Sequence, residues 1–529
     1  MAERDDNAPL ARTTAGDLRG RWDGELAVFR GVPFSAAPVG ELRFAAPRRH
    51  PGWTGIRDAG EFGPCATQPA SRLEAVMGRV DFKQSEDCLT LSVWAPPACD
   101  GPYPVLLWIH GGGFATGSGS WAFYSGQELA RNGRVVVVTA NYRLGALGYL
   151  FVPELANNAA GAANRGLLDQ VAALNWVYEN IAAFGGDPEA ITIAGQSAGG
   201  AAIAAMMTDR DSRWLFKRAI LQSPVLGPPT SLDEAAAITD HLLKVLGIAR
   251  GQIAELRSVT IDHLLAAQIQ TSKKFARFGA PVGAIQQVAD GAVITDQRAG
   301  RFESVQTGLK PGDELIGQPR DAAGTGMAVL AGTTRDEMDA FLMQEHVRYT
   351  SRQQMIRMLE EAGLAESVFD DYAAVLPGRS PAKIASAILT DQHFRIPTLR
   401  FLSEWSGNKG LAYLYRFDWQ PRPDSRYGAC HCIDVPFAMN NLGDWHSAPV
   451  PPAMLDGNKQ SEFDALAQAF QRAWIAFIWS GNPGHDGLPS WVECNASNLN
   501  SMQFDVDTRM AMNPDDHIRD LWNSSEQLW

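Results

Sequence analysis

A Gly-x-Ser-x-Gly motif between a strand-like and a helix-like segment constrains the fold of this chain more than any other feature. The motif covers residues 195–199, with Ser197 at its centre. The apolar run at residues 190–193 precedes it, and the alanine-rich stretch at residues 200–207 follows it. In a strand that turns sharply into a helix, small flanking residues let the serine project its oxygen above the edge of a sheet. The N-terminus of the following helix favours negative charge at the same place.

Strand-like and helix-like patterns alternate along much of the chain. Short antiparallel strands are predicted within residues 16–34, and another strand at 87–94. Further strands are predicted at residues 105–109, 135–140, 191–194, 327–330 and 411–417, and helices at 126–132, 167–184 and 462–479. Apolar strands that alternate with helices are typical of βαβ units and of a mostly parallel sheet covered on both faces. The sequence therefore predicts an α/β fold.

The length of the chain and its internal pattern favour different numbers of domains. A chain of 529 residues is long enough for two to four domains. Its sequence contains no internal repeat and no low-complexity linker. Two mainly helical blocks, roughly residues 225–320 and 340–405, interrupt the alternating pattern. We interpret them as helical insertions that cap one continuous sheet, which makes residues 1–529 a single domain.

Charge and composition exclude several classes of partner. The net charge of −13 argues against binding to a nucleic acid backbone or to an anionic membrane surface. The first residues are charged and lack the apolar core of a signal peptide, and the longest apolar runs are only as long as a strand. We therefore expect a cytoplasmic protein, as a monomer or homodimer, that acts on a small molecule.

The cysteines do not indicate a disulfide scaffold or a metal site. Six cysteines are few for so long a chain. Residues 430–432 read Cys-His-Cys, but consecutive residues do not easily converge on one ion, and no second Cys/His pair stands nearby at the usual spacing. No metal and no cofactor is expected.

A serine at such a turn needs a general base, an orienting carboxylate and donors for a developing oxyanion. When such residues follow successive strands, the expected chain order is serine, acid, histidine. The predicted strand at 327–330 runs into a loop that offers Asp336 or Glu337, and the strand at 411–417 runs into a loop that carries His431. Of the six histidines after Glu337, only this one follows a clear late strand; the six are His346, His393, His431, His446, His485 and His517.

The three glycines at residues 111–113 follow a buried strand and have two interpretations. They can form a flexible turn, or they can form an oxyanion hole, because glycine lets backbone N–H groups approach a developing negative charge. In the second case Gly112 and Gly113 supply two donors, and Ala198, directly after the serine, supplies a third.

Taken together, these segments resemble the type-B carboxylesterases, the family of bacterial para-nitrobenzyl esterases, animal carboxylesterases and cholinesterases. Residues 184–199 resemble the serine signature of that family, and residues 86–94 are similar to its second signature. Shorter matches occur in the same order along the chain, at residues 30–34, 141–145, 175–177, 332–337 and 428–437. The resemblance implies an α/β-hydrolase fold across nearly the whole chain.

The resemblance also implies roles for individual residues. It selects Glu337 over Asp336 as the acid, leaves Asp336 in a supporting role, and selects His431 as the base for Ser197. The implied activity is ester hydrolysis through an acyl-enzyme, without a cofactor. Because an ordinary histidine titrates near 6.5, activity should fall below roughly pH 6 to 7. Two alternatives are a carbamate or anilide hydrolase with the same triad and a non-catalytic binding module on the same fold.

Some positions depart from the family pattern, and others leave two readings open. Met338 stands where many members have glycine, Asp434 where they have glutamate, and residues 438–439 also differ. Cys65 and Cys88 match a disulfide of secreted relatives, and free thiols are expected in a reducing cytoplasm. Four aromatic residues either line the substrate pocket or belong to the core: Phe114, Trp121, Phe123 and Tyr124.

Overall fold

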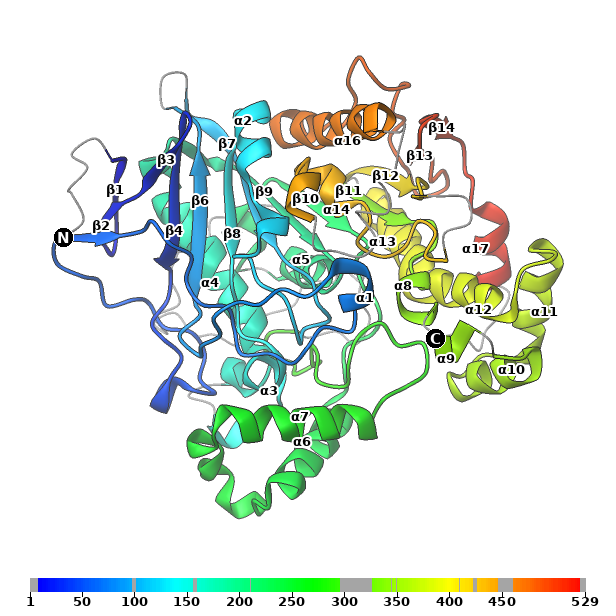
Figure 1. Cartoon of the computed structure of the whole chain (residues 1–529), viewed down its shortest axis with the longest axis horizontal. Coiled ribbons are helices and arrows are strands. Elements are labelled where there is room, and N and C mark those ends of the chain that lie inside the picture. Colours follow the sequence, from blue (N-terminus) through cyan, green and yellow to red (C-terminus); the bar gives the residue numbers. More distant parts are fainter. Residues whose placement is uncertain are drawn as a thin grey trace.

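The computed structural model confirms an α/β architecture built on one large sheet (Figure 1). It describes residues 8–523 except 98–100, 156–158, 210, 295–325, 344, 349, 409, 422–425 and 446–459. Within that part, the large sheet has eleven strands. In sheet order they are β14 (Arg509–Ala511), β13 (Ser501–Phe504), β12 (Leu411–Phe417), β11 (Ala328–Thr334), β10 (Arg218–Gln222), β9 (Gly186–Gln196), β7 (Tyr103–Ile109), β8 (Val136–Ala140), β6 (Thr90–Ala95), β4 (Leu26–Pro33) and β3 (Arg21–Asp23).

The middle of the sheet is parallel and its two edges are antiparallel. Neighbouring strands from β8 through β13 pair in parallel, whereas β3, β4 and β6 on one side and β14 on the other run antiparallel. Every residue of β7, β8 and β11 is buried. Their continuous apolar runs form strands because both faces of a central parallel sheet are covered.

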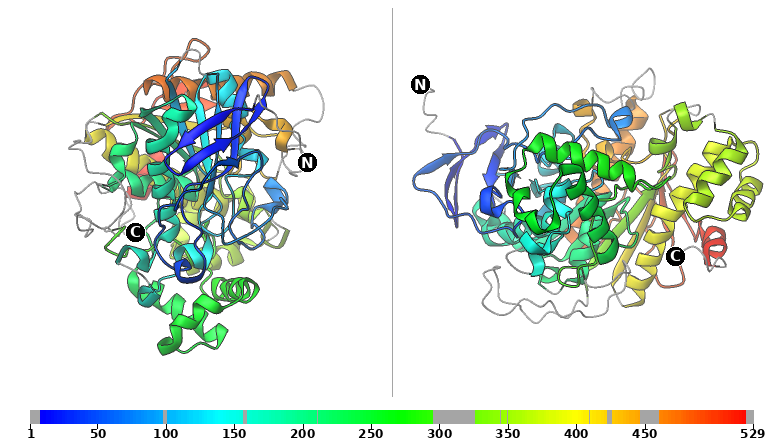
Figure 2. Two further views of the ribbon diagram at one scale, coloured as in Figure 1. Left: turned by 90° about the vertical axis from the view of Figure 1, so that its left-hand side faces the viewer. Right: turned by 90° about the horizontal axis from the view of Figure 1, so that it is seen from below.

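A second, small sheet stands beside the N-terminal edge of the large one. It consists of β1 (Leu10–Thr13), β2 (Gly16–Arg19) and β5 (Ile56–Asp58). The antiparallel strands predicted within residues 16–34 are confirmed as β2, β3 and β4, since β2 pairs antiparallel with β1 and β3 with β4. Figure 2 shows this sheet at the side of the molecule that carries the N-terminus.

Helices lie on both sides of the large sheet (Figures 1 and 2). The helices that pack directly on its strands are α2 (Gln127–Gly133), α4 (Arg165–Asn180), α5 (Ala198–Thr208), α13 (Ile396–Gly407) and α16 (Gln460–Ser480). Three of them correspond to the helices predicted at 126–132, 167–184 and 462–479. The sequence interpretation was wrong only in extending the second of these through residues 181–184, which form a 3₁₀ turn.

Two further groups of helices lie outside this layered core, as Figure 1 shows. One group holds α6 (Leu232–Leu246) and α7 (Ile261–Lys274), and the other holds α10 (Arg352–Glu361), α11 (Glu366–Val375) and α12 (Pro381–Thr390). They fall within the two helical blocks predicted at 225–320 and 340–405, although residues 295–325 lie outside the described residues. That these blocks are insertions into a single domain remains a prediction.

Local sequence signals explain where these outer helices begin and end. Ser231 caps α6 by accepting a hydrogen bond from the backbone N–H of Glu234, and Gly247 ends the helix in a left-handed conformation. Ser380 caps α12, and Pro381 occupies its first turn, where a missing N–H costs nothing. Across the described residues, no helix has the length and apolar character that a membrane span requires.

Candidate active site

Four loops that carry the predicted site residues leave the carboxyl ends of neighbouring parallel strands. Ser197 follows β9, the glycine loop follows β7, Glu337 follows β11, and His431 lies on the loop system after β12. These strands belong to one continuous run of the sheet, with β10 between β9 and β11. In open α/β sheets, sites form at this edge because the carboxyl ends of parallel strands meet there.

Ser197 stands on a strained turn between β9 and α5. Its backbone angles are φ 58° and ψ −121°, a conformation that a side chain rarely adopts. The glycines on either side make this turn possible. A β-carbon on Gly195 would lie 2.7 Å from the carbonyl carbon of Gly199, and one on Gly199 would lie 2.8 Å from the carbonyl oxygen of His110. The turn therefore packs directly against the end of β7.

The glycine loop lies beside the serine. A β-carbon on Gly111 would approach Cβ of Ser197 to 3.0 Å, so this loop and the turn are in direct contact. Gly112 and Gly113 both have positive φ values, 108° and 61°. Such angles suit glycine, which has no β-carbon to strain them. Among the described residues, no hydrogen-bond acceptor pairs with the amides of Gly112, Gly113 or Ala198.

Glu337 and His431 form a buried pair. Oε2 of Glu337 lies 2.5 Å from Nδ1 of His431, and Oε1 accepts a hydrogen bond from the backbone N–H of Thr334 at 2.7 Å. Both side chains are almost completely buried. Asp336, the alternative acid, instead accepts a hydrogen bond from the backbone N–H of Ala429 and so ties the histidine loop to the acid loop.

Gln196, which sequence reasoning overlooked, is the partner of the second imidazole nitrogen. Its Nε2 lies 3.0 Å from Nε2 of His431 and also donates to Sγ of Cys432 at 3.2 Å. Because an amide N–H₂ group only donates, Nε2 of His431 accepts and Nδ1 carries the proton toward Glu337. Within the described part of the chain, His431 is therefore bonded to Gln196 rather than to the hydroxyl of Ser197. The only available signal was the place of Gln196 inside the Gly-x-Ser-x-Gly motif.

The surroundings of His431 alter its titration. Burial lowers the pKa of His431, but Cys432 and the carboxylate of Glu337 raise it by more, so the pKa is shifted upward from its ordinary value. The acid limb of activity expected from an unperturbed histidine should therefore lie above pH 6.5.

A second buried carboxyl lies behind the pair. Oδ2 of Asp434 accepts a hydrogen bond from the hydroxyl of Tyr415 at 3.1 Å, whereas Oδ1 has no hydrogen-bond partner among the described residues. Burial raises the pKa of Asp434 to about 7, and the nearby charge of Glu337 adds to the shift. Asp434 departs from the family pattern in the sequence, and the departure places a buried aspartate close to Glu337.

Aromatic rings form the wall next to His431, but they are not the ones singled out in the sequence. The rings of Phe394 and Phe341 lie 4.9 Å and 5.6 Å from the imidazole, between ring centroids. Among the residues proposed for either pocket or core, Phe123 and Tyr124 are buried in the main core, which confirms the core reading for them. Phe114 packs instead against Tyr149, in a second buried cluster that also contains Ala198.

The four cysteines singled out in the sequence are buried thiols. The structure has Cys65, Cys88, Cys430 and Cys432 as free cysteines. Burial raises the pKa of Cys65 to about 11 and moves the pKa of Cys430 well above its ordinary value. Since thiolates are the reactive form, these groups should react slowly with thiol reagents.

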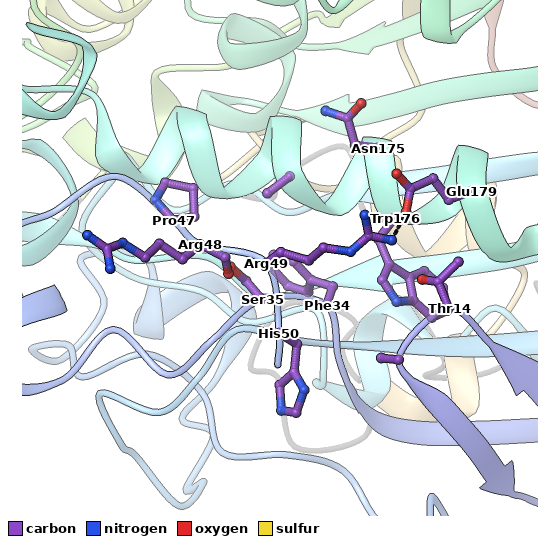
Figure 3. Close-up of a pocket in the computed structure, with 12 residues that line it drawn as sticks. Thr14, Phe34, Ser35, Pro47, Arg48, Arg49, His50, Asn175, Trp176 and Glu179 are labelled. Atoms are coloured by element: carbon purple, nitrogen blue, oxygen red, sulfur yellow. Dashed lines mark hydrogen bonds and ion pairs between the residues drawn. The ribbon is translucent and has the colours of Figure 1, made fainter. Parts of the chain in front are cut away.

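A surface pocket elsewhere in the molecule carries none of these features (Figure 3). It lies between α4 and the N-terminal segments and includes the ion pair of Arg49 with Glu179, whose atoms are 3.0 Å apart. Its lining contains no serine or cysteine paired with a histidine and none of the predicted site residues. The candidate active site is therefore the one at the carboxyl ends of β7, β9, β11 and β12.

Comparison with known proteins identifies the family of the chain. Residues 7–522 match the model of the carboxylesterase family. A phenmedipham hydrolase of Pseudarthrobacter oxydans is 37% identical over 91% of this chain and 92% of its own length. The para-nitrobenzyl esterase of Bacillus subtilis is 33% identical over 96% of this chain and 97% of its own length. A solved carboxylesterase of Geobacillus stearothermophilus superposes with a TM-score of 0.82 at 32% identity, covering 97% of this chain and 99% of that one.

These matches extend over almost the whole length of the chain and of the proteins compared. They confirm the α/β-hydrolase fold that the resemblance implied. The esterase names of the matched proteins also agree with the ester hydrolysis that it implied. The chain belongs to the carboxylesterase family and is a serine carboxylesterase that hydrolyses carboxylic esters.

Proposed function

We propose that Ser197, His431 and Glu337 are the catalytic triad of this esterase. The observation that carries the proposal is the 2.5 Å contact between Glu337 and Nδ1 of His431, with Nε2 directed at the residue next to the serine. The carboxylate holds the imidazole in the tautomer whose Nε2 accepts a proton. The arrangement is complete when Nε2 of His431 exchanges its hydrogen bond with Gln196 for one with the hydroxyl of Ser197, the next residue.

The proposed reaction proceeds in two acyl-transfer steps. His431 removes the proton of Ser197 as the oxygen attacks the ester carbonyl, and the amides of Gly112, Gly113 and Ala198 stabilise the oxyanion. His431 then protonates the leaving alcohol. Water repeats the sequence on the acyl-enzyme and releases the acid. Glu337 stabilises the imidazolium in both steps, and the reaction needs no cofactor.

Hydrolysis of para-nitrophenyl butyrate by the purified protein, beside a Ser197→Ala variant, tests the assignment. We expect turnover by the wild type and its loss in the variant, with the same melting temperature for both. Turnover that survives the substitution would exclude Ser197 as the nucleophile. A folded wild type without any turnover would favour the binding-module alternative.

A carbamate or anilide substrate is the second candidate, with the same residues in the same roles. The Pseudarthrobacter relative is named a phenmedipham hydrolase, not an esterase, so the name of this relative does not specify an ester bond. An amine is a poorer leaving group than an alcohol and depends more on protonation by His431. Comparing one acyl group as a phenyl ester and as an anilide separates the two: faster turnover of the anilide would favour this candidate.

We further propose a bacterial, cytoplasmic enzyme that acts as a monomer or homodimer on small ester molecules. The relatives described above come from bacteria, and the net charge of −13 disfavours binding to nucleic acids and anionic membranes. The helices of residues 225–320 and 340–405 are proposed to cap the site as insertions in one domain.

A further inference from the structure

An arginine close to the candidate active site has no acidic partner among the described residues. Arg72 lies just before α1 (Glu74–Met77), far in sequence from the triad. Its guanidinium carbon lies 5.6 Å from the centre of the Phe341 ring. That ring is in turn 5.6 Å from the imidazole of His431. One aromatic ring therefore separates the positive charge of Arg72 from the proposed general base.

Arg72 also contacts the opposite side of the site. Its Nη1 donates a hydrogen bond to the carbonyl oxygen of Ala280 at 3.2 Å. The next two residues, Pro281 and Val282, face the glycine loop: a β-carbon on Gly113 would lie 3.7–3.8 Å from their backbone atoms. The guanidinium thus bridges the segment beside the proposed oxyanion hole and the ring beside the proposed base.

The charge of Arg72 is not neutralised by the described part of the protein. None of the ion pairs among the described residues includes it, whereas Arg277, on the same loop as Ala280, pairs with Glu234 at 2.7 Å. Arg72 is exposed to solvent, but the atoms packed around its guanidinium lower its pKa by desolvation, and no nearby carboxylate contributes an opposing shift. Arg72 remains charged at neutral pH because an arginine side chain does not lose its proton in proteins.

Several N–H donors of the Arg72 guanidinium make no hydrogen bond to the described residues. The guanidinium lies over the ring of Phe341, a contact that uses none of its N–H donors, and Ala280 takes one of the five. The remaining donors lie in the plane of the guanidinium and match the two oxygens of a carboxylate. With a net charge of −13, the protein as a whole repels anions, whereas Arg72 provides a positive charge next to the candidate site.

We propose that Arg72 binds an anionic group on the substrate and that the enzyme prefers esters that carry a carboxylate on the acyl or the alcohol part. The proposal rests on the esterase mechanism above and names the substrate class of the same site. The ester carbonyl lies between Ser197 and the oxyanion hole, and the carboxylate end of the molecule extends past Phe341 to Arg72.

The test uses two pairs of esters that differ in charge. The first pair is para-nitrophenyl hexanoate and the mono-para-nitrophenyl ester of adipic acid, which have acyl chains of equal length. The second pair is phenyl butyrate and para-carboxyphenyl butyrate. For each ester, kcat/KM of the Arg72→Gln variant is divided by that of the wild type, so that the intrinsic reactivity of the ester cancels.

We expect Arg72→Gln to lower this ratio about tenfold more for the anionic member of at least one pair than for its neutral counterpart, as loss of a charged hydrogen bond predicts. The loss should fall mainly on KM, Arg72→Lys should recover part of it, and added salt should reduce the preference of the wild type. Arg12→Gln is the matched control. It removes the same charge from an exposed side chain on β1, at the far side of the molecule, and should change neither ratio.

Equal losses for the charged and neutral esters in both pairs would overturn the proposal. In that case, turnover of para-nitrophenyl hexanoate that is abolished by Ser197→Ala would leave the proposed triad intact. Absence of turnover of all four esters by folded wild-type protein would contradict both proposals.

Discussion

The proposed nucleophile half of the active site, around Ser197, is positioned by backbone packing, whereas the proposed acid–base half, around His431, is positioned by hydrogen bonds between buried side chains. Around Ser197, glycines are required because β-carbons would collide with carbonyl groups of β7 and of the turn itself. Around His431, Glu337 and Gln196 hold the imidazole by hydrogen bonds, and the charge of Glu337 raises the pKa of the imidazole. Substitutions that add atoms should therefore impair activity most around Ser197, and substitutions that alter charge should impair it most around His431.

The largest effect is expected from the carboxylate of the acid–base half. Glu337→Gln keeps the size of the side chain but removes the charge that stabilises the imidazolium and selects its tautomer. By analogy with other triads, we expect kcat to fall by about 10⁴-fold. Steady-state kinetics with para-nitrophenyl butyrate measures the loss. Asp370→Asn, an exposed carboxylate on α11, is the control, and a similarly small loss in both variants would exclude Glu337 from the triad.

An added methyl group tests the backbone half. In Gly112→Ala, the new β-carbon would lie 2.6 Å from the carbonyl carbon of Thr116, at a φ of 108° that alanine does not favour. The loop must shift and carry its amide donors away from the oxyanion, so kcat should fall about 10²- to 10³-fold. Gly227→Ala adds the same atom where it meets open space. If both variants retain wild-type kcat, the glycine loop does not form the oxyanion hole.

A new charge next to His431 should move the pH profile. Gln196→Glu places a carboxylate about 3.0 Å from Nε2 and stabilises the imidazolium, so the already raised pKa of His431 should rise further. Because the base acts only when neutral, the acid limb of kcat/KM should move to higher pH by about one unit or more. Gln196→Met, which adds no charge, provides the comparison. An unchanged limb in the glutamate variant would contradict the contact with His431.

The smallest effect concerns stability rather than rate. The pKa of Asp434, about 7, exceeds that of an unfolded aspartate, about 3.9, so its contribution to stability is full below about pH 4 and is lost progressively as the pH rises to 7. Asp434→Asn keeps an acceptor for Tyr415 and removes the buried charge. The variant should gain on the order of a few kcal/mol at pH 8 and roughly a third of that at pH 5. Thermal melting at both pH values checks this, and an equal shift at both would contradict it.

The sequence predicted those parts of the fold in which a local pattern decides the structure. β12 was predicted with its exact bounds, because a run of apolar and aromatic residues ends abruptly at polar ones. β10 was missed, since its five residues hold only three apolar ones between Arg218 and Gln222, and it is identified as a strand only by its pairing with β9 and β11 and its packing against α5. The edge strands β13 and β14 were also missed for lack of a local signal.

The same distinction holds for the candidate site. Ser197, Glu337 and His431 follow strands, and the order of strands along the chain is visible in the sequence. Gln196 and Phe394 contact His431 only after distant segments have packed, and no spacing in the chain relates them. Phe394 reaches the imidazole from a π-helical turn at Asp391–Arg395 that joins α12 to α13, a conformation that no sequence pattern had suggested.

Trapping of the nucleophile tests the central assignment most directly. The wild-type protein is treated with para-nitrophenyl diethyl phosphate, a reagent that phosphorylates activated serines, and the modified peptide is identified by mass spectrometry. The account predicts one diethylphosphoryl group per chain, attached to Ser197, appearing together with the loss of esterase activity and much more slowly in Glu337→Gln. A stoichiometric adduct on another residue, or full inactivation with Ser197 unmodified, would contradict it.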